Sequence, residues 1–132
     1  MTRPEHLHDP ITGQHLTFLQ SARQTDGELL QLEVRLDAGG WVPRHAHARQ
    51  DEHVKVLDGR LCVRVGRSER TLEVGDSVQV PRRKLHLLRN SGDGEARFLL
   101  DVRPARRMEG AMRVLFCAMR LVSPLTRLRR RT

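Results

Sequence analysis

The sequence has few aromatic residues, no tyrosine and few lysines. One tryptophan and three phenylalanines are spread over 132 residues, and Lys55 and Lys84 are the only lysines. Aromatic side chains this sparse do not form a platform on which nucleic-acid bases could stack. The net charge of +8 and the pI near 11.2 come from arginines scattered along the chain. Because such a charge is only a general attraction to acidic partners, we do not expect a nucleic-acid partner.

Cysteine and long apolar runs are also scarce. Cys62 and Cys117 lie far apart in apolar segments, which is typical of reduced, buried thiols and not of a disulfide. No apolar run approaches the ~20 residues that cross a membrane. The residues after Met1 do not resemble a signal peptide either. The sequence therefore predicts a cytoplasmic protein without a membrane partner.

Short alternating segments dominate the middle of the chain. Residues 29–36 place Leu30, Leu32, Val34 and Leu36 on one face of a strand. Similar short segments follow at regular intervals, separated by turn residues, and Asp58-Gly59 is a hairpin signal. Many short strands in a chain of single-domain length favour a sandwich or a barrel.

The stretch from Gly39 to Gly59 contains candidate metal ligands. His45 and His47 are two residues apart, so on an extended strand both imidazoles leave the same face. Glu52 follows after a short polar interval that can return the chain beside the first strand. Two neutral imidazoles and one carboxylate can hold a divalent ion and leave positions open. His86 is a fourth candidate further along the chain. The alternative is a metal-free core in which these polar side chains bond one another.

These residues also fit a known family. The spacing of Gly39, His45-x-His47, Glu52 and Gly59 resembles the first sequence motif of the cupins, and a second motif is recognised in Gly75, Pro81, His86 and Asn90. Arg83 departs from this pattern, because the family usually has glycine two residues after the proline. This departure concerns the turn before His86 and not the ligand itself.

The resemblance implies an all-β fold, the double-stranded β-helix or jelly-roll barrel, which cupins use. We expect a loose arm over residues 1–10 and the barrel over residues 11–103. From Pro104 the apolar residues recur at three and four positions, which predicts a helix over residues 104–123 that ends before Pro124. Its methionine-rich face covers the barrel or a dimer contact, or forms an adaptable lid. Residues 124–132 are expected to form a solvated basic tail.

The resemblance also implies a metal-dependent function. His45, His47, Glu52 and His86 would bind one divalent metal per chain, with iron, manganese, nickel or cobalt favoured and zinc possible. An enzyme of dioxygenase-like, oxidoreductase type acting on a small molecule is the favoured interpretation. Alternatives are a non-catalytic small-molecule binding or sensing protein, and a metal-dependent isomerase or lyase.

The remaining expectations concern the surroundings of the metal and the assembly. Trp41 shares the parity of the two first-motif histidines, so we expect it to line the cavity. Arg44 and Arg49 flank the ligands and could bind an anionic substrate; the alternative is that they are solvated loop charges. The sequence identifies no catalytic residue beyond the metal centre. Similar cupins form homodimers, and we expect one here.

Overall fold

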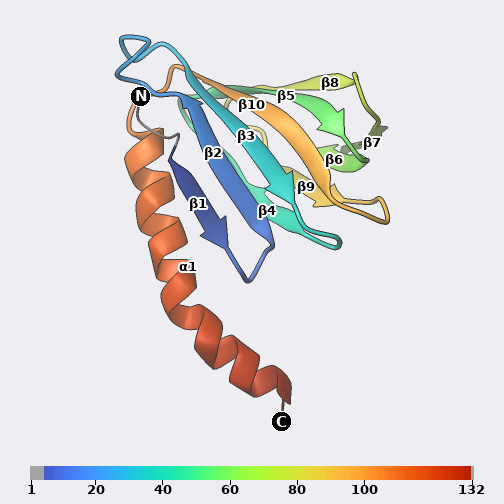
Figure 1. Ribbon diagram of the computed structural model, residues 1–132. Coiled ribbons are helices and arrows are strands. Elements are labelled where there is room, and N and C mark those ends of the chain that lie inside the picture. The colour runs from blue at the N-terminus through green and yellow to red at the C-terminus, as the bar shows by residue number, and fades with distance from the viewer. Residues whose placement is uncertain (1–4, 132) are drawn as a thin grey trace.

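The computed structural model describes residues 5–131 and gives side chains as far as residue 121. Within this part of the chain, ten strands form two antiparallel sheets, and one helix follows the last strand (Figure 1). Both sheets contribute buried side chains to a common core. This confirms the predicted all-β jelly-roll barrel with a C-terminal helix.

The larger sheet has six strands in the order β1-β2-β3-β10-β5-β8. Its members are β1 (His6–Asp9), β2 (Gln14–Gln20), β3 (Leu30–Leu36), β10 (Ala96–Arg103), β5 (Asp51–Asp58) and β8 (Ser77–Val80). The smaller sheet has four strands in the order β4-β9-β6-β7. Its members are β4 (Trp41–His45), β9 (His86–Asn90), β6 (Leu61–Val65) and β7 (Ser68–Leu72).

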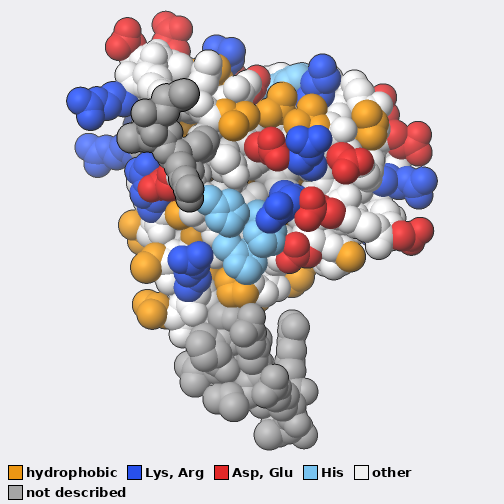
Figure 2. Space-filling view, in the orientation of Figure 1, with side chains coloured by type: hydrophobic (Ala, Val, Ile, Leu, Met, Phe, Trp, Pro, Cys, Tyr) orange, Lys and Arg blue, Asp and Glu red, His pale blue; other side chains and the backbone are white. Residues whose placement is uncertain are grey.

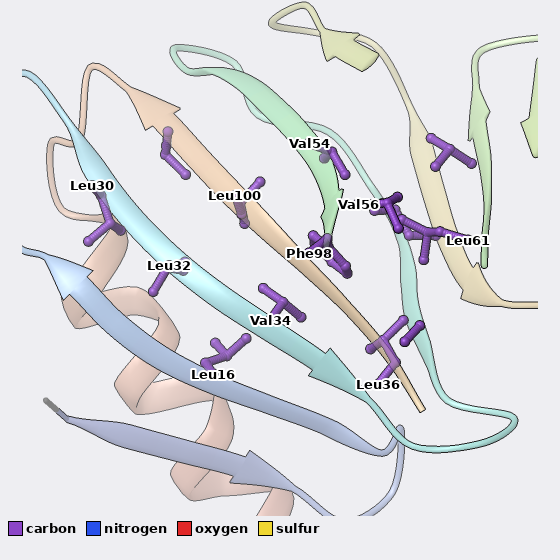
Figure 3. Close-up of a cluster of buried hydrophobic side chains, with 14 of the residues drawn as sticks. Leu16, Leu30, Leu32, Val34, Leu36, Val54, Val56, Leu61, Phe98 and Leu100 are labelled. Atoms are coloured by element: carbon purple, nitrogen blue, oxygen red, sulfur yellow. The ribbon is translucent and has the colours of Figure 1, made fainter. Parts of the chain in front are cut away.

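The core lies between the sheets and follows the predicted alternation. All four apolar residues of β3 that share one face are buried, and Phe98 of β10 is buried beside them (Figure 3). Burying one such side chain contributes about 1.5–3 kcal/mol. The intervening residues Gln31, Glu33 and Arg35 lie on the outer face and are half-buried. The alternation of apolar and polar residues therefore turns one face of β3 toward the core and the other outward.

The turn at Asp58 and Gly59 does not form the predicted hairpin between paired strands. β5 pairs with β10 and β8, whereas β6 pairs with β7 and β9, so this turn carries the chain from one sheet to the other. Gly59 has a φ of 78°, and a Cβ placed there would lie 2.6 Å from the carbonyl oxygen of Glu95. Glycine is required at this position because the crossing is too close for a side chain.

The predicted loose arm over residues 1–10 is wrong for the part that the structure describes. Residues 6–9 form β1, which pairs with β2 at the edge of the larger sheet. The Asp9 carboxylate accepts hydrogen bonds from the backbone N–H of Ile11, at 2.9 Å, and from the Thr12 hydroxyl. These bonds close the turn between β1 and β2, so Pro10 ends the strand instead of preventing it. Residues 1–4 lie outside the described part of the chain.

The helix α1 (Met108–Arg131) begins four residues after the predicted start and continues past the predicted end. The helix continues through Pro124, so residues 124–131 are helical and do not form the predicted tail. Met108 and Phe116 are buried against the barrel. Arg113 donates a hydrogen bond of 2.6 Å to Glu5, beside β1. As Figure 1 shows, α1 begins beside β1 and then extends away from the sheets.

Both cysteines are free, as the sequence predicts, and Cys62 is buried. Cys117 is exposed, contrary to the predicted burial, because it lies on the side of α1 that faces away from the barrel. Among residues 5–131, no helix combines the length and the apolar character that crossing a membrane requires.

Candidate metal centre

The four predicted ligands come together inside the barrel. One nitrogen or carboxylate oxygen from each residue can be chosen so that all lie within 4.8 Å of one another, and these residues are His45, His47, Glu52 and His86. Within the described side chains, the sequence-derived set is therefore complete and convergent. Their binding of a metal stays a prediction.

Both sheets and one loop contribute to the cluster. His45 ends β4 and His86 begins β9, and the two residues are cross-strand partners with ring centroids 4.1 Å apart. Glu52 lies on β5 in the other sheet, with its side chain facing inward. His47 lies in the loop between β4 and β5. Residues of both sheets thus meet in this cluster, at one point of the barrel interior.

Backbone carbonyls orient two of the imidazoles. The Nδ1 of His45 lies 2.6 Å from the carbonyl oxygen of Pro43, and the Nδ1 of His86 lies 3.0 Å from that of Lys84. Because a carbonyl only accepts, each Nδ1 carries the proton and each Nε2 has a free lone pair. The buried Nε2 of His86 has no hydrogen-bond partner. A metal ion would satisfy this atom, so the residues fit such a group.

The carboxylate at the centre is held in its charged form. Burial raises the pKa of Glu52, but the interactions with the His47 and His86 imidazoles outweigh burial and lower the pKa to about 2. The Nε2 of His47 lies 2.6 Å from one carboxylate oxygen, and the Nε2 of His86 lies 3.7 Å from the other. Burial lowers the pKa of His45. For His86, burial also lowers the pKa, but the interaction with Glu52 prevails and raises it.

A cavity of about 1040 Å³ opens from this cluster. Leu16, Val34 and Phe98 of the larger sheet form one side of its wall, and Met112 and Phe116 of α1 form another. The methionine-rich face of the helix therefore lines the cavity and does not cover the outside of a closed barrel. A volume of this order accepts a small molecule and buries most of its surface.

Trp41 does not line the cavity, contrary to the prediction. In the pairing of β4 with β9, Val42 faces Leu88 and His45 faces His86, so β4 has one more residue than its partner over this interval. This β-bulge reverses the alternation of side chains between the two pairs. Val42 therefore lies in the cavity wall with His45, and the parity that pointed to Trp41 does not hold.

The arginines near the cluster are divided by position. Arg49 lines the cavity, and its substrate-binding role stays a prediction, whereas Arg44 is exposed and lies outside the lining. Sequence reasoning missed Arg106 and Arg107, which line the cavity from the segment between β10 and α1. The available signal was a pair of adjacent arginines directly before the apolar face of the predicted helix. Three arginines thus contribute to the lining of the cavity.

Arg83 occupies the position at which the cupin pattern usually has glycine. Its φ of 69° lies in the left-handed region, which suits glycine better than arginine. Its N–H donates a hydrogen bond of 2.6 Å to the carbonyl oxygen of His47. The turn before His86 therefore keeps its conformation although arginine stands in place of glycine. Its hydrogen bond also joins the backbone segments that carry His47 and His86.

A jelly-roll barrel whose inward side chains gather three histidines and a glutamate has the fold and the site of a cupin. The family model for the cupin domain matches residues 32–102, and this chain belongs to the cupin family. The curated relative named tetracenomycin polyketide synthase protein TcmJ, from Streptomyces glaucescens, is 32% identical over 101 residues, which is 76% of this chain. That match spans 66% of the relative's length, just under two thirds.

Two solved structures are also similar. An RmlC-like cupin from Shewanella frigidimarina has a TM-score of 0.67 and 25% identity, and the match covers 78% of this chain and 86% of that one. A recombinant oxalate oxidase in complex with glycolate has a TM-score of 0.63 and 25% identity, and the match covers 72% of this chain and 53% of that one.

Proposed function

We propose that His45, His47, Glu52 and His86 hold one divalent metal ion per chain. The observation that carries the proposal is the buried Nε2 of His86, which has no partner although three other donor groups surround it. A buried polar atom left unpaired costs free energy, and a shared metal ion would remove this cost. The backbone carbonyls that bond the two Nδ1 atoms already direct the free lone pairs inward.

The donor set favours iron, manganese, nickel or cobalt, because three imidazoles and a carboxylate leave about two positions of a six-coordinate ion free. Zinc fits the donor types with fewer free positions. Such an ion supplies Lewis acidity and open positions for oxygen donors. We infer that the protein is a metal-dependent small-molecule enzyme of oxygenase type.

The cavity supports an oxygen-rich substrate with a large apolar part. Its walls are mostly apolar, and the methionines of α1 can adapt to an irregular shape. Arg49, Arg106 and Arg107 would bind a carboxylate or an enolate oxygen and orient the molecule toward the cluster. The relative named for a polyketide synthase agrees with a substrate of this class, and the oxalate oxidase with glycolate agrees with a carboxylate group.

Metal analysis of the tag-free protein tests this proposal. We expect about one iron, manganese, nickel or cobalt ion per chain, and its loss in His47→Ala and in His86→Ala. His53→Ala is the matched control, because His53 lies on the outer face of β5. Retention of the same metal content in both ligand variants would contradict the proposed site. Anaerobic substrate titration followed by oxygen uptake then tests the oxygenase reaction.

A second candidate is a non-catalytic binding or sensing protein. It is favoured by one observation: apart from the three ligand residues that line the cavity, its lining contains no histidine, aspartate, glutamate, lysine or tyrosine. Among the side chains described up to residue 121, no free one in the lining can therefore act as a general base, which also disfavours a metal-dependent isomerase or lyase. A ligand that raises the melting temperature without turnover under any of the four metals would support the binding protein.

We also propose that the chain forms a homodimer through α1. Val114 and Leu121 of α1 are more than half exposed. They are about two helical turns apart and therefore share one face of the helix, which a second copy would cover symmetrically. Light scattering should give about twice the chain mass of 15.2 kDa. A mass near 15.2 kDa would contradict the dimer.

A further inference from the structure

A second histidine cluster lies on the outer face of the larger sheet. Donor atoms of His8, His15 and Asp37 can be chosen so that they lie within 4.8 Å of one another. Figure 2 shows histidine side chains gathered on the face that carries β1 and β2. This cluster shares no residue with the barrel site, because its side chains leave the opposite face of the sheet.

The strand register places the two imidazoles side by side. His8 of β1 and His15 of β2 are direct cross-strand partners, and their rings are stacked with centroids 4.1 Å apart. Cross-strand neighbours on one face have Cβ atoms about 5 Å apart, which is a separation from which two imidazoles can reach one ion. The register thus brings together two donors that are seven positions apart in the sequence.

The carboxylate is fixed by its backbone. Asp37 follows β3, and its N–H donates a hydrogen bond of 3.0 Å to the carbonyl oxygen of Gly13. A Cβ on Gly13 would lie 3.3 Å from the Cβ of Asp37 and 3.4 Å from a carboxylate oxygen, so glycine leaves room for this side chain. The Nε2 of His15 lies 3.0 Å from the other carboxylate oxygen.

One pair in the cluster is already close enough to share an ion. The Nε2 of His15 and the Asp37 oxygen 3.0 Å from it could both bind one ion, which would replace the hydrogen bond between them. The Asp37 side chain is half-exposed, so an ion could reach the cluster from solution.

A third imidazole lies beside the cluster. The ring of His6 is stacked on that of His15, with the centroids 5.7 Å apart. The positive charge of Arg120 acts on this patch and would repel a cation, so we expect weaker binding here than in the barrel.

We propose that His8, His15 and Asp37 form a second metal site, for a zinc-class divalent ion. Two imidazoles and a carboxylate with one side open to water match the donors that zinc accepts. The bound ion would tie the edge strand β1 to β2 and to the end of β3. Because Glu5, beside β1, pairs with Arg113 of α1, the site would also hold the strand against which the helix packs.

Zinc binding by the tag-free, full-length protein tests this site. After dialysis against about 10 µM free Zn²⁺, His15→Ala should retain about one zinc ion per chain fewer than the wild type. His53→Ala, which removes another outer-face histidine of the same sheet, should retain the wild-type amount. Asp37→Asn should weaken the outer site by about tenfold, because it removes the only anionic donor.

A second background separates this site from the barrel. The double variant His47→Ala, His86→Ala should still bind about one zinc ion, and adding His15→Ala should abolish that binding. Zinc should also raise the melting temperature of the wild type more than that of His15→Ala. Equal zinc content in His15→Ala and wild type, or an equal loss in His53→Ala, would overturn the proposal. If the barrel variants unfold, the comparison of the single variants decides.

Discussion

The two histidine clusters contain similar donors, one inside the barrel and one on the outer face of the larger sheet. The pattern His-x-His occurs in both, as His45 with His47 and as His6 with His8. In the barrel cluster both members of the pair converge on Glu52, which is buried. In the outer cluster only His8 belongs to the converging set, and the carboxylate there is half-exposed. The barrel cluster opens into a large apolar cavity, whereas the outer cluster lies on the sheet surface.

This difference separates two uses of the same side chains. Burying a charged carboxylate costs much free energy unless the carboxylate is paired. The members of the barrel cluster therefore interact strongly. The outer cluster is partly exposed, so its polar groups lose little hydration and its pairs contribute little to stability. The barrel cluster therefore suits chemistry on a bound molecule, and the outer cluster suits a structural ion.

The largest expected effect concerns acid stability of the metal-free protein. Glu52 has a pKa of about 2 in the folded state against an ordinary value of 4.5. Its contribution to the free energy of unfolding is thus present above pH 4.5 and is lost as the pH falls through 2. The contribution is about 3 kcal/mol. Denaturant unfolding in the presence of a chelator should show Glu52→Gln less stable by about this amount at pH 7 and nearly equal to the wild type at pH 2.

The outer cluster supplies the control. Asp37→Asn should change the free energy of unfolding by less than about 1 kcal/mol over the same range, because its contact with His15 is exposed and solvent weakens it. A loss in Asp37→Asn as large as that in Glu52→Gln would remove the energetic distinction between the clusters.

The fold and the barrel cluster could be predicted from the sequence because their signals are local or follow a known motif. The alternation in β3 and the two cupin motifs depend on short spacings. The role of Val42 could not be predicted, because a β-bulge in β4 reverses the parity that pointed to Trp41. A single extra residue changes every assignment on one side of it.

The outer cluster could not be predicted for a different reason. His8, His15 and Asp37 meet only because β1 pairs with β2 and β2 pairs with β3 in a defined register. A sequence with two proline residues around His6 and His8 gives no sign of that edge strand. The long-range pairing, not the spacing of the histidines, determines which carboxylate joins them.

A smaller effect than that of Glu52→Gln concerns the turn that supports only the barrel cluster. Arg83 has a φ of 69°, and a residue with a side chain costs about 1 kcal/mol in this region. Because its side chain is exposed, Arg83→Gly should raise the free energy of unfolding by about 1 kcal/mol and keep the hydrogen bond to His47. Lys84→Gly is the matched control and should lower stability, because Lys84 does not have a positive φ. A loss of stability in Arg83→Gly would mean that contacts of the arginine side chain outweigh its backbone strain. The support of the barrel cluster would then depend on that side chain.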